Sequence, residues 1–207
     1  MPPLPRRART RSRLRAPALT ALDAASLEPA GPEALRSDEL ADSLLLEGAD
    51  LTGVDLRGSR IVASRLDRPR APELRATDGS WREVELLSPR VGALALDGAA
   101  LSSVLISGGK VDWLSLRGAE LTDVVIEDAT ITSLDLTEAR LTRVALRDCR
   151  IDELTMDRAT CADVDLREVR PGVVHGVDAL RGATVGPAQL IDLAPQLAAQ
   201  LGIRVAD

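Results

Sequence analysis

The sequence predicts an all-β protein, a quadrilateral parallel β-helix followed by short C-terminal α-helices. Three observations lead there: a five-residue apolar period, a twenty-residue superperiod and a near absence of aromatic side chains. The chain has 207 residues, enough for one domain with a core, yet it contains no Phe, no Tyr and only two Trp. Aromatic residues normally supply much of the buried area. Aliphatic side chains must therefore fill a narrow, repetitive interior.

The five-residue period runs from Leu46 to Leu166. None of its 25 positions is charged or polar, although 28% of the chain is charged, and 21 of them are Leu, Ile, Val or Met. A period of five fits neither the 3.6-residue repeat of a helix nor the two-residue alternation of a long strand. It indicates a chain that turns a corner every five residues.

The twenty-residue superperiod appears two positions before each member of that series. Leu recurs there every twenty residues, Val recurs every twenty residues in a second set, and mostly small residues stand between them; the two sets are Leu74, Leu94, Leu114, Leu134 and Leu154, and Val84, Val104, Val124, Val144 and Val164. Four pentapeptides therefore make one coil. Equivalent residues should stack on successive coils about 4.8 Å apart.

Individual pentapeptides carry a family resemblance. Stretches such as 49–53 (ADLTG), 119–123 (AELTD) and 139–143 (ARLTR) resemble the A(D/N)LXX unit of pentapeptide-repeat proteins. The resemblance covers roughly residues 40–185 and implies a right-handed quadrilateral β-helix. It is specific for the fold, because the motif specifies stacking and not a site.

The chain divides into four parts. We expect a disordered Arg/Pro-rich tail at 1–17, an N-terminal capping segment with a short helix at 18–40, the β-helix at 41–185 and a C-terminal helical cap at 186–207. Helical spacing in the cap is interrupted at Pro195, which favours two short helices.

Irregular stretches keep the repeat frame. The motif weakens between Leu66 and Leu86, but the twenty-residue spacing persists, which predicts one degenerate coil with Trp81 pointing inward. Trp113 should lie at a corner. A last imperfect coil should include Val169, Val173 and Val174.

Charge is distributed unevenly. The formal net charge is −6, but residues 1–16 carry six Arg and no acid, which leaves 20 basic groups against 32 acidic ones in the rest. Nucleic-acid contact by the basic tail is not expected, because the tail has no aromatic residues for base stacking.

No apolar run approaches the length of a membrane span, so we expect a cytoplasmic protein that does not insert into membranes.

Chemistry-bearing residues form no recognisable site. Cys149 and Cys161 lack metal-ligand spacing and should be buried, inert and on different sides of the coil. His175 is the only histidine and has no nearby acid in the sequence. The sequence therefore predicts no catalytic residue, no metal and no cofactor, and a protein that is not an enzyme.

Two binding functions remain. The first is a protein-binding or scaffold module with an unidentified partner. The second is implied by the resemblance: some family members act as dimeric acidic DNA mimics that bind DNA gyrase and protect it from quinolones. Residues for a homodimer contact would be the C-terminal Leu190, Ile191, Leu197 and Leu201. The chain departs from those members in having no Phe and many surface Arg.

One surface column is apolar. On three sides of the coil, the position just before each member of the five-residue series carries mixed polar residues. On the fourth side this position reads Glu85, Leu105, Val125, Ala145, Asp165. We expect Leu105, Val125 and Ala145 to form a contiguous apolar stripe. Its occupant could be the N-terminal segment with Leu19, Leu22 and Leu27, a second subunit or the partner, or the stripe could reflect strand preference alone.

Overall fold

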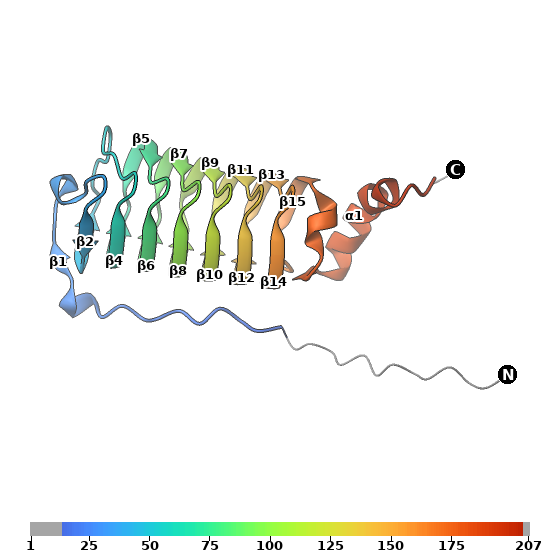
Figure 1. Cartoon of the computed structure of the whole chain (residues 1–207), viewed down its shortest axis with the longest axis horizontal. Helices are drawn as coiled ribbons and strands as arrows, with labels where there is room; N and C mark the ends of the chain where they lie inside the picture. Colours follow the sequence, from blue (N-terminus) through green and yellow to red (C-terminus); the bar gives the residue numbers. More distant parts are fainter. Residues whose placement is uncertain (1–13, 205–207) are drawn as a thin grey trace.

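The computed structural model describes residues 14–204 and forms a right-handed parallel β-helix with a helix at its C-terminal end (Figure 1). The strands form two sheets, one of ten strands and one of six. The all-β prediction is therefore confirmed. The expectation of disorder at 1–17 falls mostly on residues 1–13, which lie outside the described part.

The ten-stranded sheet contains β1 (Glu28–Pro29), β2 (Leu40–Asp42), β3 (Leu44–Glu47), β4 (Arg60–Asp67), β6 (Ser80–Leu87), β8 (Ala100–Ser107), β10 (Glu120–Glu127), β12 (Arg140–Arg147), β14 (Thr160–Asp165) and β16 (Ala183–Thr184). The six-stranded sheet contains β5 (Arg70–Arg75), β7 (Arg90–Ala95), β9 (Lys110–Ser115), β11 (Thr130–Asp135), β13 (Arg150–Thr155) and β15 (Arg170–His175).

The register confirms the twenty-residue coil. Leu121 pairs with Leu101 on the coil before it and with Leu141 on the coil after it, and Ile131 pairs with Ile151. Every pairing is parallel, so each residue stacks on the equivalent residue of the next coil. Any surface property that repeats every twenty residues consequently becomes a straight column along the rod.

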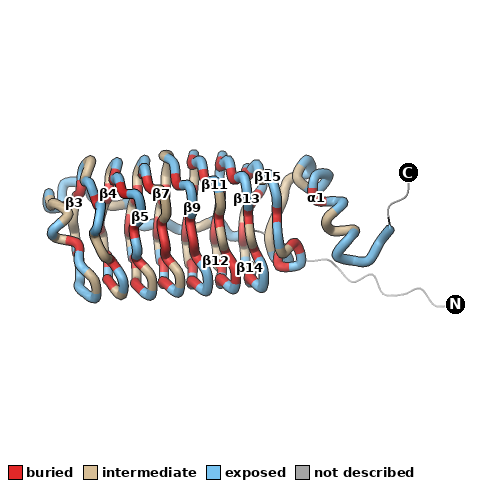
Figure 2. The backbone as a smooth tube through the Cα atoms, turned by 90° about the horizontal axis from the view of Figure 1, so that it is seen from above, coloured by how far each residue is buried: buried red, intermediate tan, exposed pale blue. Residues whose placement is uncertain are grey.

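The core is a continuous column of aliphatic side chains. Buried positions recur at the same places in successive coils (Figure 2). Leu66, Leu86 and Leu96 are fully buried, and the smaller residues between them, such as Ala99 and Ala119, are equally inaccessible. Large and small residues fill the interior together, which gives the close packing of a protein core.

The weak stretch between Leu66 and Leu86 is an intact coil. β5 and β6 pair in register with β7 and β8, so the prediction of one degenerate coil is confirmed. Trp81 is completely buried, whereas Trp113 lies within β9 and is 41% exposed. Trp81 fills the interior space that the small side chains of Ala71 and Ala76 leave.

The N-terminal cap differs from the expected short helix. It consists of two 3₁₀ turns, η1 (Ala24–Ser26) and η2 (Pro32–Ala34), on either side of β1. The expected helix lies before Pro29, where residues 18–23 have no regular secondary structure and η1 is a single turn. The amides of Glu28 and Ala30 donate to the carbonyls of Ser43 and Leu45 at 2.7 and 2.9 Å. The cap therefore pairs with the first exposed sheet edge.

The C-terminal cap also corrects the sequence prediction. After the 3₁₀ turn η3 (Val177–Leu180), one helix, α1 (Pro187–Gln200), continues through Pro195, where two helices were expected. Pro195 removes one helical hydrogen bond inside α1, but the buried Leu193 packs the helix against the last coil and keeps it continuous. The Gln189 side chain donates to the carbonyls of Leu166 and Val169 at 2.5 and 2.6 Å. This residue joins α1 to the last coil.

The stacking predicts that substitutions at adjacent inward-facing and outward-facing residues of β8 have very different effects on stability. Leu101→Asp places a charge in the core and should lower the free energy of unfolding by at least about 3 kcal/mol. Ser102→Asp, exposed and in register with Arg82, should change it by less than about 0.5 kcal/mol. Chemical denaturation of both variants measures the difference, and equal stability would contradict the assigned orientation.

Candidate functional site

An extended N-terminal segment, residues 15–20, runs along the outside of the ten-stranded sheet (Figure 1). Three of its backbone amides donate to side chains on three different coils. The amide of Arg15 donates to Asp163 at 3.2 Å, that of Ala18 to Asp123 at 2.9 Å and that of Thr20 to Ser103 at 2.7 Å. We call this stretch the docked segment.

The spacing of these bonds follows from the coil geometry. Ser103 and Asp163 are three coils apart, about 14 Å at the usual inter-strand distance. Five residues of extended chain span about 15 Å. An extended peptide therefore matches the rod closely enough for its amides to reach successive acceptors, and it runs opposite to the direction in which the coils stack.

The acceptors belong to one column that bends the long strands. Ser103, Asp123 and Asp163 all have left-handed backbone conformations, with φ of 56°, 56° and 57°. Asp tolerates this region better than most residues, because its short polar side chain can bond locally. The column continues through Glu83 and Arg143, so it presents polar side chains outward along several coils.

Asp123 has two partners in the described structure. Its carboxylate accepts from Arg143 on the next coil, at 2.6 and 2.7 Å, and from the amide of Ala18. The hydrogen bonds from Arg143 lower the pKa of Asp123 most, and the Ala18 amide lowers it further. Asp123 is thus held ionised, as a strong acceptor for a backbone amide.

The apolar stripe lies beside this column. Val125 and Ala145 are 2% and 1% exposed although their side chains point away from the core. Leu105 is half-buried and shares a small cavity of about 200 Å³ with Leu19 and Ala21. Of the occupants left open by the sequence, the docked segment lies there. A second subunit could reach the stripe only by displacing it.

The leucines expected to cover the stripe behave differently from one another. Leu19 borders the cavity but remains 37% exposed, and Leu27 is buried in the N-terminal cap instead. The docked segment is therefore held largely by its backbone amides. The sequence analysis selected the stripe, whose role as a contact surface stays a prediction, but did not select Ser103, Asp123 and Asp163, whose twenty-residue recurrence was the available signal.

A second apolar surface covers the C-terminal end. Leu190, Ile191 and Leu201 are 52%, 73% and 75% exposed. Leu197 packs partly against the core, and Leu193, which the sequence analysis did not select, is buried there. The four residues expected to form a C-terminal contact thus divide into three exposed residues and one that anchors α1.

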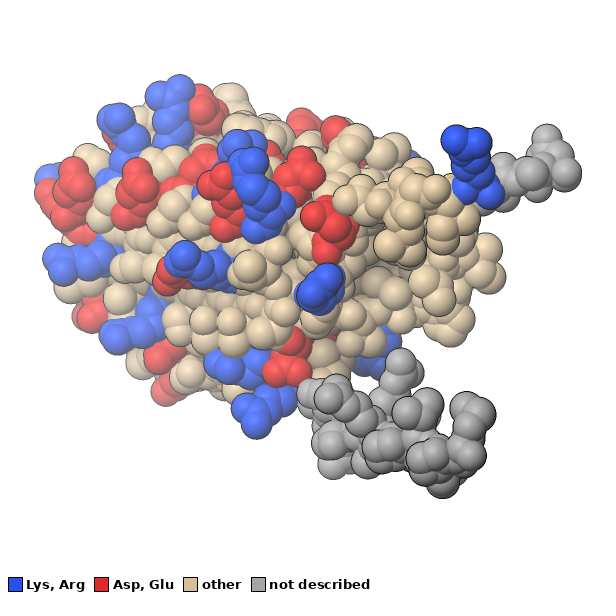
Figure 3. Space-filling view, turned by 45° about the vertical axis from the view of Figure 1, so that its right-hand side comes forward, with Lys and Arg blue, Asp and Glu red and all other residues tan. Residues whose placement is uncertain are grey.

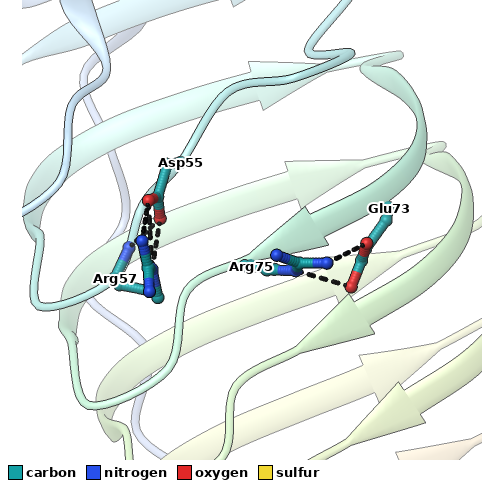
Figure 4. A network of polar contacts seen from close by, with 4 residues as sticks. All are labelled: Asp55, Arg57, Glu73 and Arg75. Atoms are coloured by element: carbon teal, nitrogen blue, oxygen red, sulfur yellow. Dashed lines mark hydrogen bonds and ion pairs between the residues drawn. The ribbon is translucent and has the colours of Figure 1, made fainter.

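Charged side chains form a mixed surface. Acidic and basic groups are interspersed over the face drawn in Figure 3. Many pair two residues apart at one corner, as Asp55 with Arg57 and Glu73 with Arg75 do (Figure 4). Others pair across coils, as Glu120 does with Arg140. The hydrogen bonds from Arg57 lower the pKa of Asp55 to about 2.

One end of the rod is an exception to this mixture. Residues 23–60, which form the N-terminal cap and the first coil, contain nine Asp and Glu and only three basic residues, Arg36, Arg57 and Arg60. Charges of one sign within a Debye length of about 8 Å reinforce one another at physiological ionic strength. This end therefore carries a local negative potential that the middle of the rod lacks.

The thiols and the histidine have structural surroundings. Cys149 is buried, whereas Cys161 is only half-buried, which corrects the expectation for Cys161. Burial raises the pKa of both thiols, that of Cys161 to about 11, so both stay protonated at neutral pH. The coil also brings Glu153 to 3.1 Å from His175, an acid partner that was not apparent in the sequence.

Two further absences concern residues 14–204. In that range no group of three or more His, Cys, Asp or Glu residues is arranged to hold a metal ion. Within the same range, no helix has the length and apolar character needed to cross a membrane.

The docked segment should be released by charges in the stripe. In the variant Leu105→Lys with Val125→Lys, we expect the amides of Ala18 and Thr20 to lose their protection from hydrogen exchange, because lysine cannot be accommodated under the segment. Core amides should exchange as before. Ala100→Lys, on an exposed position of β8, is the matched control. Unchanged protection of Ala18 in the double variant would contradict the contact.

Comparison with known proteins finds only distant structural similarity. No protein-family model and no curated protein sequence matches the chain. A trypsin-treated variant of QnrB1, a plasmid-mediated fluoroquinolone resistance protein, is similar in structure, with 15% identity over 83% of this chain and 93% of that chain and a TM-score of 0.30.

HetL, a pentapeptide-repeat protein involved in heterocyst differentiation regulation from the cyanobacterium Nostoc sp., is 17% identical over 74% of this chain and 92% of that chain, with a TM-score of 0.24. At these values the alignments add no argument of their own. The register itself, with four five-residue sides in each coil and apolar residues at every central position, shows that the chain folds as a pentapeptide-repeat β-helix.

Proposed function

We propose that the protein is a non-catalytic scaffold whose ten-stranded sheet binds an extended segment of a protein partner. The observation that supports this proposal best is the docked segment, because it is an extended peptide bound to three coils through its own amides. In the free chain this segment occupies the site, and the partner replaces it.

Backbone recognition suits a scaffold on a repeating rod. Amide donors are common to nearly all residues, so Ser103, Asp123 and Asp163 can bind them with little dependence on sequence. Specificity then comes from side chains that meet the stripe around Leu105. The rigid spacing of the coils orders the acceptors before binding, which reduces the entropic cost of recognition.

A binding function also agrees with the chemistry of the surface. Acidic groups such as Asp55, Glu73 and Asp123 are hydrogen-bonded to arginines and have lowered pKa values. A general acid at neutral pH needs the opposite shift. The interior is filled by aliphatic side chains and offers a substrate no space.

A peptide added in trans tests the proposal. In a variant lacking residues 1–22, a labelled peptide of residues 14–22 should bind to the vacant face, with fluorescence anisotropy as the measurement. Binding to the full-length protein should be weaker, because the attached segment competes at a high effective concentration. Failure of the peptide to bind the shortened variant would contradict the proposal.

Methylated peptides provide the matched control. Methylation of the Ala18 amide removes the donor to Asp123 and should weaken binding about tenfold. Methylation of the Leu19 amide should have a smaller effect, because within the described structure this amide has no hydrogen bond to the rod. Equal losses would indicate that shape, and not amide donation, governs the contact.

The gyrase-binding function implied by the family resemblance is the second candidate. The observation that favours it is the acidic end formed by residues 23–60. The exposed Leu190, Ile191 and Leu201 would supply a contact between two copies, as a dimeric rod requires. The mixed charges along the middle of the rod favour the scaffold, because DNA presents an unbroken negative surface.

A supercoiling assay distinguishes the two candidates. With purified protein in molar excess over DNA gyrase at low salt, we expect supercoiling to proceed unchanged, since paired acids cannot imitate a phosphate backbone. Inhibition would support mimicry instead. That inhibition should then weaken with added salt, because the Debye length falls to about 3 Å at 1 M.

A further inference from the structure

A column of cations follows one corner of the rod, on the six-stranded sheet. Arg70 pairs in register with Arg90, and Arg90 with Lys110. Like charges on directly opposed residues of neighbouring strands destabilise a sheet. The arrangement therefore opposes folding unless an anion offsets the repulsion.

Arg90 is the central member of this column. It lies between two cations and forms no ion pair within the described residues, whereas Lys110 pairs with Asp112 at 2.7 Å. Arg70 has Asp50 as its neighbour on the preceding coil and reaches the Gly48 carbonyl at 3.5 Å. The guanidinium of Arg90 is left without a protein acid.

The corner beside Arg90 changes character along the rod. Two positions before the cationic column, the first coils carry Arg68, Ser88 and Gly108, whereas the later coils carry Asp128, Asp148 and Glu168. Acids thus accompany Arg150 and Arg170 but not Arg90. The column is unbalanced in its first half alone.

The unbalanced half surrounds an open depression. Its lining residues are Gly48, Arg68, Arg70, Ser88 and Arg90, and its volume is about 510 Å³, within the range of small-molecule sites. Arg68 pairs with Asp67 at 3.1 Å and Asp50 lies opposite Arg70, so the depression holds three guanidinium groups with two carboxylates nearby. Guanidinium groups bind phosphate in a bidentate manner, and a serine hydroxyl adds a donor.

We infer that this depression is a binding site for a small phosphoryl oxyanion of the diphosphate class. Arg70 and Arg90 bind its oxygens from neighbouring coils, and Arg68 and Ser88 close the corner. The ligand removes the repulsion between stacked cations, so binding also stabilises the coil. The site is on a different corner from the docked segment and is independent of the proposed scaffold function.

Calorimetric titration of the full-length protein with inorganic pyrophosphate tests the inference. We expect saturable binding at one site, weakened about tenfold or more by Arg90→Gln. The matched control is Arg82→Gln, which removes the same charge from an exposed position outside the column, between Val62 and Ser102. Equal weakening by both variants, or no saturable binding by the unaltered protein, would overturn the assignment.

Thermal unfolding distinguishes binding of the anion at Arg90 from a general effect of removing one positive charge. Without anion, Arg90→Gln should raise the midpoint or leave it unchanged, because the stacked repulsion is relieved. Pyrophosphate should raise the midpoint of the unaltered protein and of Arg82→Gln, but not that of Arg90→Gln. Parallel titrations with phosphate and with a nucleoside diphosphate separate a free oxyanion from a nucleotide as the source of the phosphoryl group. An increase for Arg90→Gln equal to that of the unaltered protein would contradict the site.

Discussion

In-register parallel stacking is the constraint on which the rest of this structure depends. Each residue sits directly against the residue twenty positions away, so inward positions must tolerate an identical neighbour above and below. Aliphatic residues meet that requirement with little loss of packing. Outward positions obey the same geometry, and for them the consequence is electrostatic. A charged residue that recurs every twenty positions lies about 4.8 Å from a residue of the same charge, unless residues of opposite charge alternate with it. Asp123 and Arg143 alternate in this manner, whereas Arg70 and Arg90 do not.

The same stacking leaves an unpaired row of backbone groups at each end, and the two caps solve this problem by different means. At the N-terminal end, β1 adds one more parallel strand, with proline-flanked turns that stop it from continuing. At the C-terminal end the frame slips, and a side chain substitutes for the next strand: Gln189 donates to two carbonyls of the last coil while its own oxygen accepts from the amide of Gly186 at 2.6 Å. Both devices protect an edge that would otherwise pair with another chain.

Sequence reasoning recovered what is periodic and failed where the periodicity ends. The coil, the burial of Trp81 and the exposure of Trp113 follow from the five- and twenty-residue periods, because each period maps to one geometric repeat. The caps carry no repeat. Local signals there were misleading: Pro195 suggested two helices, but packing of Leu193 on the last coil keeps one. The partner of His175 was missed for a related reason, since Glu153 is distant along the chain but adjacent across coils. The N-terminal segment was one expected occupant of the stripe, but the hydrogen bonds of its amides could not be predicted, because amide donors have no sequence signature.

The two candidate binding surfaces show how one lattice of equivalent positions can serve different ligands. Beside the stripe, the acceptors Ser103, Asp123 and Asp163 repeat at a spacing that an extended peptide can match with its amides. At the other corner, Arg70, Arg90 and Lys110 repeat donors at the same spacing, and the coil brings several cations within reach of one compact anion. Neither surface contributes to the core, so each can change without loss of the fold. In this architecture a side chain that recurs every twenty residues forms a column along the rod, so the chemistry of each column can be read from a sequence once its coil length is known.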